Sequence, residues 1–100
     1  MPTMTNSEFR AAAHRLADLA ADYLDSLEHA GPGSRVVSDA QPGDVAALLP
    51  QRAPDEGEPF DDILADLQRV VMPGITHWQH PRFFGYFPCN TSPPAILAEF

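Results

Sequence analysis

The hydrophobic positions near the start of the chain recur at steps of three and four residues, as on one face of a helix. The members of this stripe are Phe9, Ala12, Ala13, Leu16, Leu19, Ala20, Tyr23, Leu24 and Leu27. Thr5 and Glu8 have the spacing of a capping box, in which each side chain accepts a hydrogen bond from the backbone of the other. Proline cannot continue a helix, so Gly31-Pro32-Gly33 stops it. The pattern predicts a helix over about residues 6–29.

A second apolar stripe predicts a helix over residues 59–72. Its members are Phe60, Ile63, Leu64, Leu67, Val70 and Val71. The connection between the two helices, residues 31–58, is repeatedly broken by proline and glycine. Within it, only Asp44 to Leu49 has room for one or two helical turns.

The last third of the chain changes character. Residues 83–87 are rich in aromatic side chains and read as a short strand, interrupted by Gly85. Ser92 and the two prolines after it then form a helix start, with Ser92 as N-cap. The chain ends soon after this start, so we expect it to be cut inside a helix. The predicted fold class is therefore mostly α, with one short strand.

Composition narrows the possible partners. The 100 residues carry a net charge of −8, with six arginines and no lysine. A clustered basic patch is absent, which argues against binding to nucleic acid or to an anionic membrane surface. No run of about 18 apolar residues is present, so no membrane span is expected. The single cysteine excludes an internal disulfide, and a reducing, cytoplasmic setting is expected.

Few residues suggest chemistry of their own. His77 and His80 are three apart, but Gly74 and Pro81 disfavour a helix there and no third ligand is evident, so no metal site is predicted. Cys89 has no partner base that the spacing would identify. The chain also lacks a glycine-rich phosphate loop. No catalytic residue is assigned.

The aromatic cluster is the most informative feature of the sequence. Five of the nine aromatic residues fall within ten positions: Trp78, Phe83, Phe84, Tyr86 and Phe87. Two helices offer too little cover to bury five such rings in so short a chain. Either a partner surface covers some of them, or some line a ligand pocket suited to flat rings. We expect at least one of Phe83 and Phe84 to be core.

The stretch from Met72 to Pro88 resembles the N-terminal signature of group II pyridoxal-phosphate-dependent amino-acid decarboxylases, most closely the aromatic-L-amino-acid decarboxylase branch. The resemblance rests on two motifs. The first is Met72-Pro73-Gly74 with Thr76-His77-Trp78, and the second is Phe83-Phe84 with Tyr86-Phe87-Pro88. Asn6–Arg10, Pro42–Pro50 and Phe60–Asp66 resemble the same family, so the resemblance covers essentially the whole chain.

This resemblance implies a much longer enzyme of fold type I that uses pyridoxal 5′-phosphate. Residues 1–88 would be its N-terminal helical segment, packed across the partner subunit of a homodimer. Residues 89–100 would begin the large cofactor-binding domain. In the family, the lysine that holds the cofactor lies beyond this segment. The lack of lysine here agrees with that, because no other side chain forms an imine with the cofactor aldehyde.

The family's reaction is decarboxylation of aromatic L-amino acids to arylalkylamines. The resemblance implies that Trp78, Tyr86, Phe87, Pro88 and Cys89 wall the substrate pocket. Cys89 stands where many relatives have a threonine, and a thiol is the weaker hydrogen-bond donor. Two alternatives stay open: a stand-alone helical interaction or dimerisation module without catalysis, and an aldehyde synthase of the same family.

Overall fold

A computed structural model of the chain describes residues 3–86 and 91–100, and this part is helical, without a β-strand. The elements are α1 (Asn6–Glu28), α2 (Asp44–Leu48), α3 (Phe60–Asp66), a π-helical turn η1 (Leu67–Val71), a 3-10 turn η2 (Met72–Gly74) and α4 (Pro93–Glu99). No helix in the described ranges is both long and apolar enough to cross a bilayer. The mostly α fold class predicted from sequence is confirmed.

The first helix begins with the predicted capping box. The Thr5 hydroxyl accepts a hydrogen bond from the Glu8 N–H at 3.2 Å, and the Glu8 carboxylate accepts from the Thr5 N–H at 2.7 Å. Together these bonds satisfy two backbone donors that the first turn of a helix leaves unpaired. The helix ends at Glu28, within one residue of the predicted end.

The second predicted helix is present but changes its winding. It is α-helical over Phe60–Asp66, then widens into η1 and tightens into η2. The Met72 N–H bonds to the Leu67 carbonyl, five residues back instead of four. Pro73 follows at once, and in an α-helix its ring would clash with the carbonyl four residues earlier. The wider turn before this proline avoids that clash.

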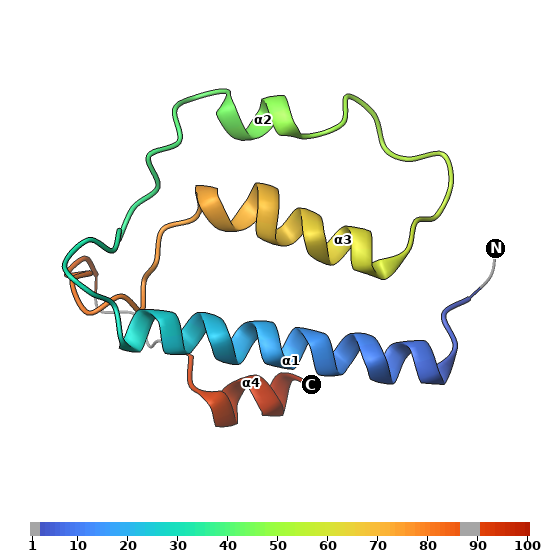
Figure 1. Cartoon of the computed structure of the whole chain (residues 1–100), viewed down its shortest axis with the longest axis horizontal. Helices are drawn as coiled ribbons and strands as arrows, with labels where there is room; N and C mark the ends of the chain where they lie inside the picture. The colour runs from blue at the N-terminus through green and yellow to red at the C-terminus, as the bar shows by residue number, and fades with distance from the viewer. Residues whose placement is uncertain (1–2, 87–90) are drawn as a thin grey trace.

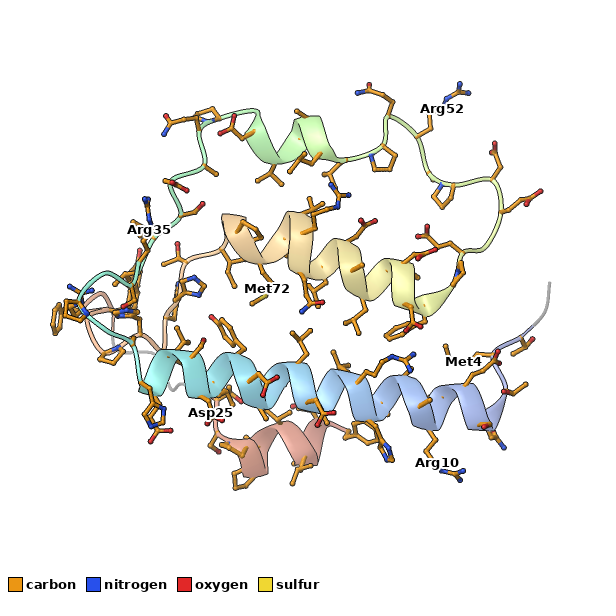
Figure 2. All side chains as sticks on the ribbon, in the orientation of Figure 1. Met4, Arg10, Asp25, Arg35, Arg52 and Met72 are labelled. Atoms are coloured by element: carbon orange, nitrogen blue, oxygen red, sulfur yellow. The ribbon has the colours of Figure 1, made fainter. Side chains whose placement is uncertain are left out.

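The helices lie side by side in one irregular layer (Figure 1). The rod formed by α3 and η1 runs along one side of α1, with α2 beyond it, and α4 lies on the opposite side of α1. Met72 points from the end of the rod toward α1, whereas Arg10 and Arg52 extend into solvent (Figure 2). The molecule measures 46 × 35 × 23 Å.

This arrangement buries very little. Within the described ranges, Ala12, Leu27 and Val70 are the buried hydrophobic residues, and His80 is the buried polar residue. The accessible surface is 8325 Å², whereas a compact monomer of this mass, 10.9 kDa, exposes about 5,600 Å². The radius of gyration is 16.2 Å, against about 13 Å for a compact 100-residue domain. The apolar stripes of the helices are therefore left largely uncovered.

The predicted strand over residues 83–87 is wrong in its described part. Residues 83–86 are irregular, with a bend at Gly85 and a left-handed backbone at Tyr86, whose φ is 55°. A strand needs a second strand to pair with, and the described residues offer none. Phe87 lies outside them. The predicted division between residues 1–88 and 89–100 also falls in the undescribed stretch 87–90 and stays a prediction.

The last helix follows its predicted start. Ser92 is the N-cap of α4, and its hydroxyl accepts a hydrogen bond from the Ala95 N–H at 3.4 Å. Pro93 and Pro94 occupy the first turn, where a missing N–H costs nothing. At the other end of α4, its C-cap Phe100 contacts α1, where the ring centroids of Phe9 and Phe100 are 6.4 Å apart.

Candidate functional site

The aromatic residues of the last third gather around Trp78. The rings of Phe83 and Tyr86 both stack on it, with centroid separations of 5.4 Å and 5.5 Å and interplanar angles of 17° and 19°. We call these three rings the aromatic stack. It is far from buried, because Trp78 is 45% exposed and Tyr86 is 78% exposed. The stack therefore presents ring surface that this chain does not cover.

The backbone beneath the stack is specialised. Tyr86 has a left-handed φ of 55°, which costs a residue with a side chain roughly 1–2 kcal/mol. Gly85 lies directly under the Phe83 ring, where an added Cβ would stand 3.2 Å from Phe83 Cζ. The absence of a side chain at Gly85 thus lets the Phe83 ring lie close to the backbone.

A small cavity lies next to Trp78, with a volume of about 270 Å³. It is lined by Tyr23 and Leu24 of α1, by Gln79, which follows Trp78, and by Ile96 of α4. Gln79 Nε2 donates to the Thr91 carbonyl at 3.3 Å, which links this cavity to the start of α4. The volume is slightly below the usual range for ligand sites, about 300–1,000 Å³. It is an open partial site rather than an enclosed one.

Hydrogen bonds to α1 and its following loop hold the segment before the stack. The Tyr23 hydroxyl lies 2.7 Å from His77 Nδ1, and the two rings are 5.6 Å apart between centroids. Burial raises the pKa of the Tyr23 phenol. The His77 N–H also donates to the Val36 carbonyl at 2.8 Å. Trp78, the next residue, is thus fixed relative to α1.

His80 makes a second set of contacts to the same loop. Its Nε2 lies 2.8 Å from the Ser34 hydroxyl, and its Nδ1 accepts from the Arg82 N–H at 3.0 Å. The Arg82 guanidinium donates to the carbonyls of Pro32 and Ser34 at 3.2 Å and 2.8 Å. We call residues 31–36 and 77–83, joined by these bonds, the loop junction.

Two of the predicted site residues come together in the structure. Trp78 and Tyr86 stack on each other, and both are exposed. Phe87, Pro88 and Cys89 lie outside the described residues. The assignment of all five residues to the wall of a substrate pocket stays a prediction.

Other residues of the site were missed or misjudged from sequence. Phe83 is only half-buried and joins the stack, and Phe84 is 88% exposed, so the expectation that one of them is core was wrong. Their apolar character did not show which ring would find a partner. The sequence also did not indicate that Tyr23 and His80 hold this region by hydrogen bonds. Their partners lie 54 and 46 residues away along the chain, so no local pattern predicts these contacts.

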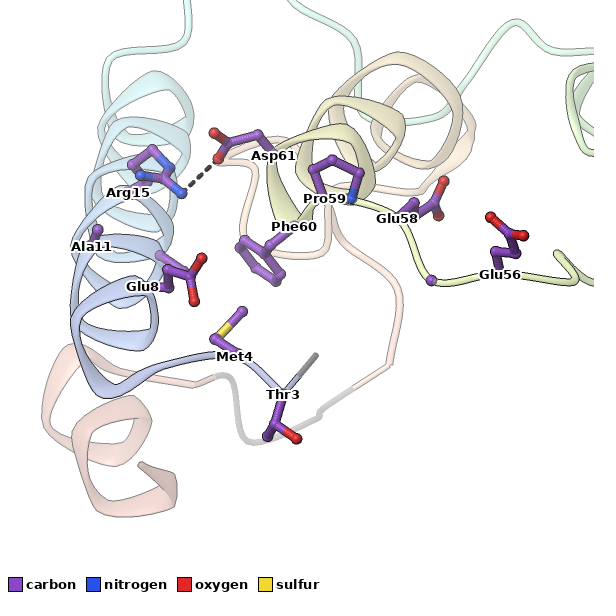
Figure 3. Close-up of a pocket in the computed structure, with 12 residues that line it drawn as sticks. Thr3, Met4, Glu8, Ala11, Arg15, Glu56, Glu58, Pro59, Phe60 and Asp61 are labelled. Atoms are coloured by element: carbon purple, nitrogen blue, oxygen red, sulfur yellow. Dashed lines mark ion pairs between the residues drawn. The ribbon is translucent and has the colours of Figure 1, made fainter. Parts of the chain in front are cut away.

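A larger cavity lies at the other end of α1, between its first turns and the start of α3 (Figure 3). Its volume is about 920 Å³, and Met4 and Phe60 face it. Arg15 and Asp61 pair at its edge at 2.5 Å, and Glu8 is engaged in the helix cap. Three of the charged groups that line this cavity are thus already partnered, and Glu56 and Glu58 add two further carboxylates to its lining. In the described ranges, no three His, Cys, Asp or Glu residues gather as a metal site would require.

Comparison with known proteins gives consistent results. Residues 42–100 match the model of the pyridoxal-dependent decarboxylase conserved domain. The chain is 45% identical over 96 residues to an aromatic-L-amino-acid decarboxylase from Rattus norvegicus. The matched region covers 96% of this chain and 19% of that protein. The chain thus spans about a fifth of the length of the curated relatives it matches.

Two solved structures resemble the chain closely in fold. A tryptophan decarboxylase from Catharanthus roseus, in complex with L-tryptophan, has a TM-score of 0.81 at 37% identity over 99% of this chain and 20% of that one. A 4-hydroxyphenylacetaldehyde synthase from Rhodiola rosea has a TM-score of 0.82 at 33% identity over 96% of this chain and 20% of that one. The open helical arrangement described above therefore recurs in these larger proteins.

Proposed function

Because the chain belongs to the pyridoxal-dependent decarboxylase family, we propose that it is part of an enzyme that decarboxylates aromatic L-amino acids to arylalkylamines. In this proposal, the segment supplies one wall of the substrate pocket and contacts to a partner subunit. It does not supply a residue that reacts with the substrate.

The aromatic stack is the observation that carries the proposal. Its central ring, Trp78, is 45% exposed and its outer ring, Tyr86, is 78% exposed. Exposed flat rings favour a flat ring ligand, because offset stacking adds about 0.5–1.5 kcal/mol beyond the area buried. The solved relative from Catharanthus roseus holds L-tryptophan, a substrate with such a ring. Phe87, Pro88 and Cys89 are proposed to extend the same wall.

The cofactor must be held mainly by protein outside these 100 residues. The chain contains no lysine and therefore cannot attach pyridoxal phosphate covalently. Pyridoxal phosphate supplies an electron sink for the electrons released when the carboxylate leaves. In this proposal, the segment binds and orients the aromatic side chain of the substrate. Binding of this kind lowers KM without assisting the bond cleavage itself.

The uncovered apolar stripes support a homodimer. Side chains such as Phe9, Leu16 and Ile63 are about half exposed, and the accessible surface far exceeds that of a compact monomer. We propose that a partner subunit and the remainder of the enzyme cover these faces. The net charge of −8 disfavours nucleic acid as the partner. The single cysteine supports a cytoplasmic location.

A chimera tests the proposed function. In the rat relative, the segment that this chain matches is replaced by this chain; we call the product the rat chimera. We expect it to convert L-tryptophan to tryptamine and CO2. Trp78→Ala should raise KM about three- to tenfold, since it removes one stacking contact and leaves the bond-breaking groups intact. Phe84→Ala, an exposed aromatic outside the stack, is the matched control.

The outcomes separate the possible functions. Equal KM values for the Trp78→Ala and Phe84→Ala chimeras would contradict the assigned pocket wall. An aldehyde with release of ammonia and hydrogen peroxide, in place of tryptamine, would favour the aldehyde-synthase alternative. A chimera that binds cofactor but releases no CO2 from any aromatic amino acid would refute the decarboxylase proposal.

A further inference from the structure

His80 is the most buried polar side chain of the described ranges, with only 4% of its surface exposed. An imidazole in such a place must have partners for its ring nitrogens, because an unsatisfied buried polar group costs about 1–3 kcal/mol. Both nitrogens have them. Nδ1 lies 3.0 Å from the Arg82 backbone nitrogen and Nε2 lies 2.8 Å from the Ser34 hydroxyl oxygen.

Only one protonation state satisfies all of these bonds. The Arg82 N–H is a donor, so His80 Nδ1 must be the unprotonated acceptor. The Ser34 hydroxyl donates its single hydrogen to the Gly31 carbonyl at 2.7 Å, so it must accept from His80 Nε2–H. The neutral imidazole with hydrogen on Nε2 fits both requirements. His80 is thereby the central member of a directed chain from the Arg82 N–H to the Gly31 carbonyl.

This chain of bonds spans the loop junction and is joined through the backbone to the aromatic stack. His80 is two residues after Trp78, and the Phe83 N–H donates to the His80 carbonyl at 2.9 Å. Trp78 and Phe83, which stack at 5.4 Å, are therefore attached to the backbone on either side of the same anchored residue. A shift of His80 moves both rings.

We propose that His80 is a positioning residue for the aromatic wall of the substrate pocket. Its neutral imidazole ties residues 77–83 to the loop after α1 and so fixes where Trp78 and Phe83 stand. This inference rests on the proposed function of the stack as a pocket wall. His80 itself touches neither the substrate nor the reacting atoms in this proposal.

The test uses His80 variants of the rat chimera. His80→Ala leaves both the Arg82 N–H and the Ser34 hydroxyl without their imidazole partner. We expect KM for L-tryptophan to rise about tenfold with kcat within about threefold, because a displaced wall weakens binding of the ring and leaves the cleavage step unchanged. His80→Asn places an amide oxygen where Nδ1 stood, so it should restore the Arg82 bond and recover part of the KM.

Controls separate positioning from a general loss of structure. Ser34→Ala removes the other end of the chain by a small change, so it should raise KM in the same direction even if His80→Ala fails to fold. His14→Ala, at an exposed position of α1, should leave KM unchanged. A second readout is amide hydrogen exchange, which should speed up in residues 77–83 of the His80→Ala and Ser34→Ala chimeras.

Each outcome decides the question. Unchanged KM and unchanged exchange in both variants would overturn the inference, as would a fall in kcat with KM constant. If the unaltered chimera folds but decarboxylates no aromatic amino acid, the proposed function fails, while the exchange measurement still tests whether His80 holds residues 77–83.

Discussion

At the scale of single residues, the stack depends on two neighbouring backbone positions. Tyr86 adopts a left-handed backbone that costs roughly 1–2 kcal/mol, and stacking on Trp78 returns about 0.5–1.5 kcal/mol. The two magnitudes nearly balance. The conformation of Tyr86 therefore depends on Trp78 being in place, and loss of either ring disturbs the wall as a whole.

Gly85 allows a direct test at this scale. In Gly85→Ala the new Cβ would stand 3.2 Å from Phe83 Cζ, which is tight enough to push the ring away. We expect a loss of about 1 kcal/mol in the free energy of binding an aromatic substrate, seen as a roughly fivefold higher KM in the rat chimera. Gly33→Ala is the matched control, since its Cβ meets nothing within 4 Å. Equal effects of the two substitutions would contradict the close ring contact.

At the scale of elements, α1 is the support on which the other helices lie. It runs for 23 residues, and its last turn has no basic residue. Asp25 and Glu28 instead stand near the negative end of the helix dipole, which disfavours them. The helix therefore depends on its N-terminal cap and on packing against α3 and α4.

The cap gives a prediction with a pH dependence. Thr5→Ala should cost about 1 kcal/mol of helix stability, measured as faster amide hydrogen exchange in the first turns of α1 in the rat chimera. Hydrogen bonds from the Thr5 backbone and hydroxyl lower the pKa of Glu8 below its ordinary value of 4.5. The ionised Glu8 carboxylate therefore stabilises α1 above about pH 4.5. This stabilisation is lost as the pH falls through the lowered pKa of Glu8.

Two variants check the origin of that acid dependence. Thr5→Ala should weaken it, because the hydroxyl no longer bonds to Glu8. Thr3→Ala, two residues before the cap and outside the helix, should leave both the stability and its pH dependence unchanged. A cap without energetic importance would make the Thr5 and Thr3 variants indistinguishable.

At the scale of the whole molecule, surface area is the dominant fact. The chain exposes 8325 Å², roughly half as much again as a compact monomer of its mass. A protein of this size cannot offset its conformational entropy without more burial. The helices are therefore expected to depend on surrounding protein for a single packed arrangement.

This argument predicts how the separate 100-residue chain behaves. We expect a broad urea transition with a small slope, binding of a hydrophobic dye and self-association in sedimentation. The same residues in the rat chimera should be protected from amide exchange, which serves as the control. A sharply unfolding monomer that binds no dye would instead support the alternative of a self-sufficient interaction module.

The sequence by itself determined the features that depend on near neighbours. Helical periodicity and capping act over three or four residues, so the limits of α1, the start of α3 and the Ser92 cap were all predictable. The cluster that forms the stack was recognisable for a similar reason, since its rings lie close together in the chain. Even there, the expected strand failed, because pairing needs a second strand that local pattern cannot supply.

Only the tertiary structure decided which rings meet and what holds them. The Tyr23–His77 contact spans 54 residues and the Ser34–His80 contact spans 46. Such contacts depend on where an irregular connection brings two distant segments, and hydrophobic periodicity says nothing about that path. The burial of His80 follows from this folding of the loop over the turn, so its importance could be found only in three dimensions.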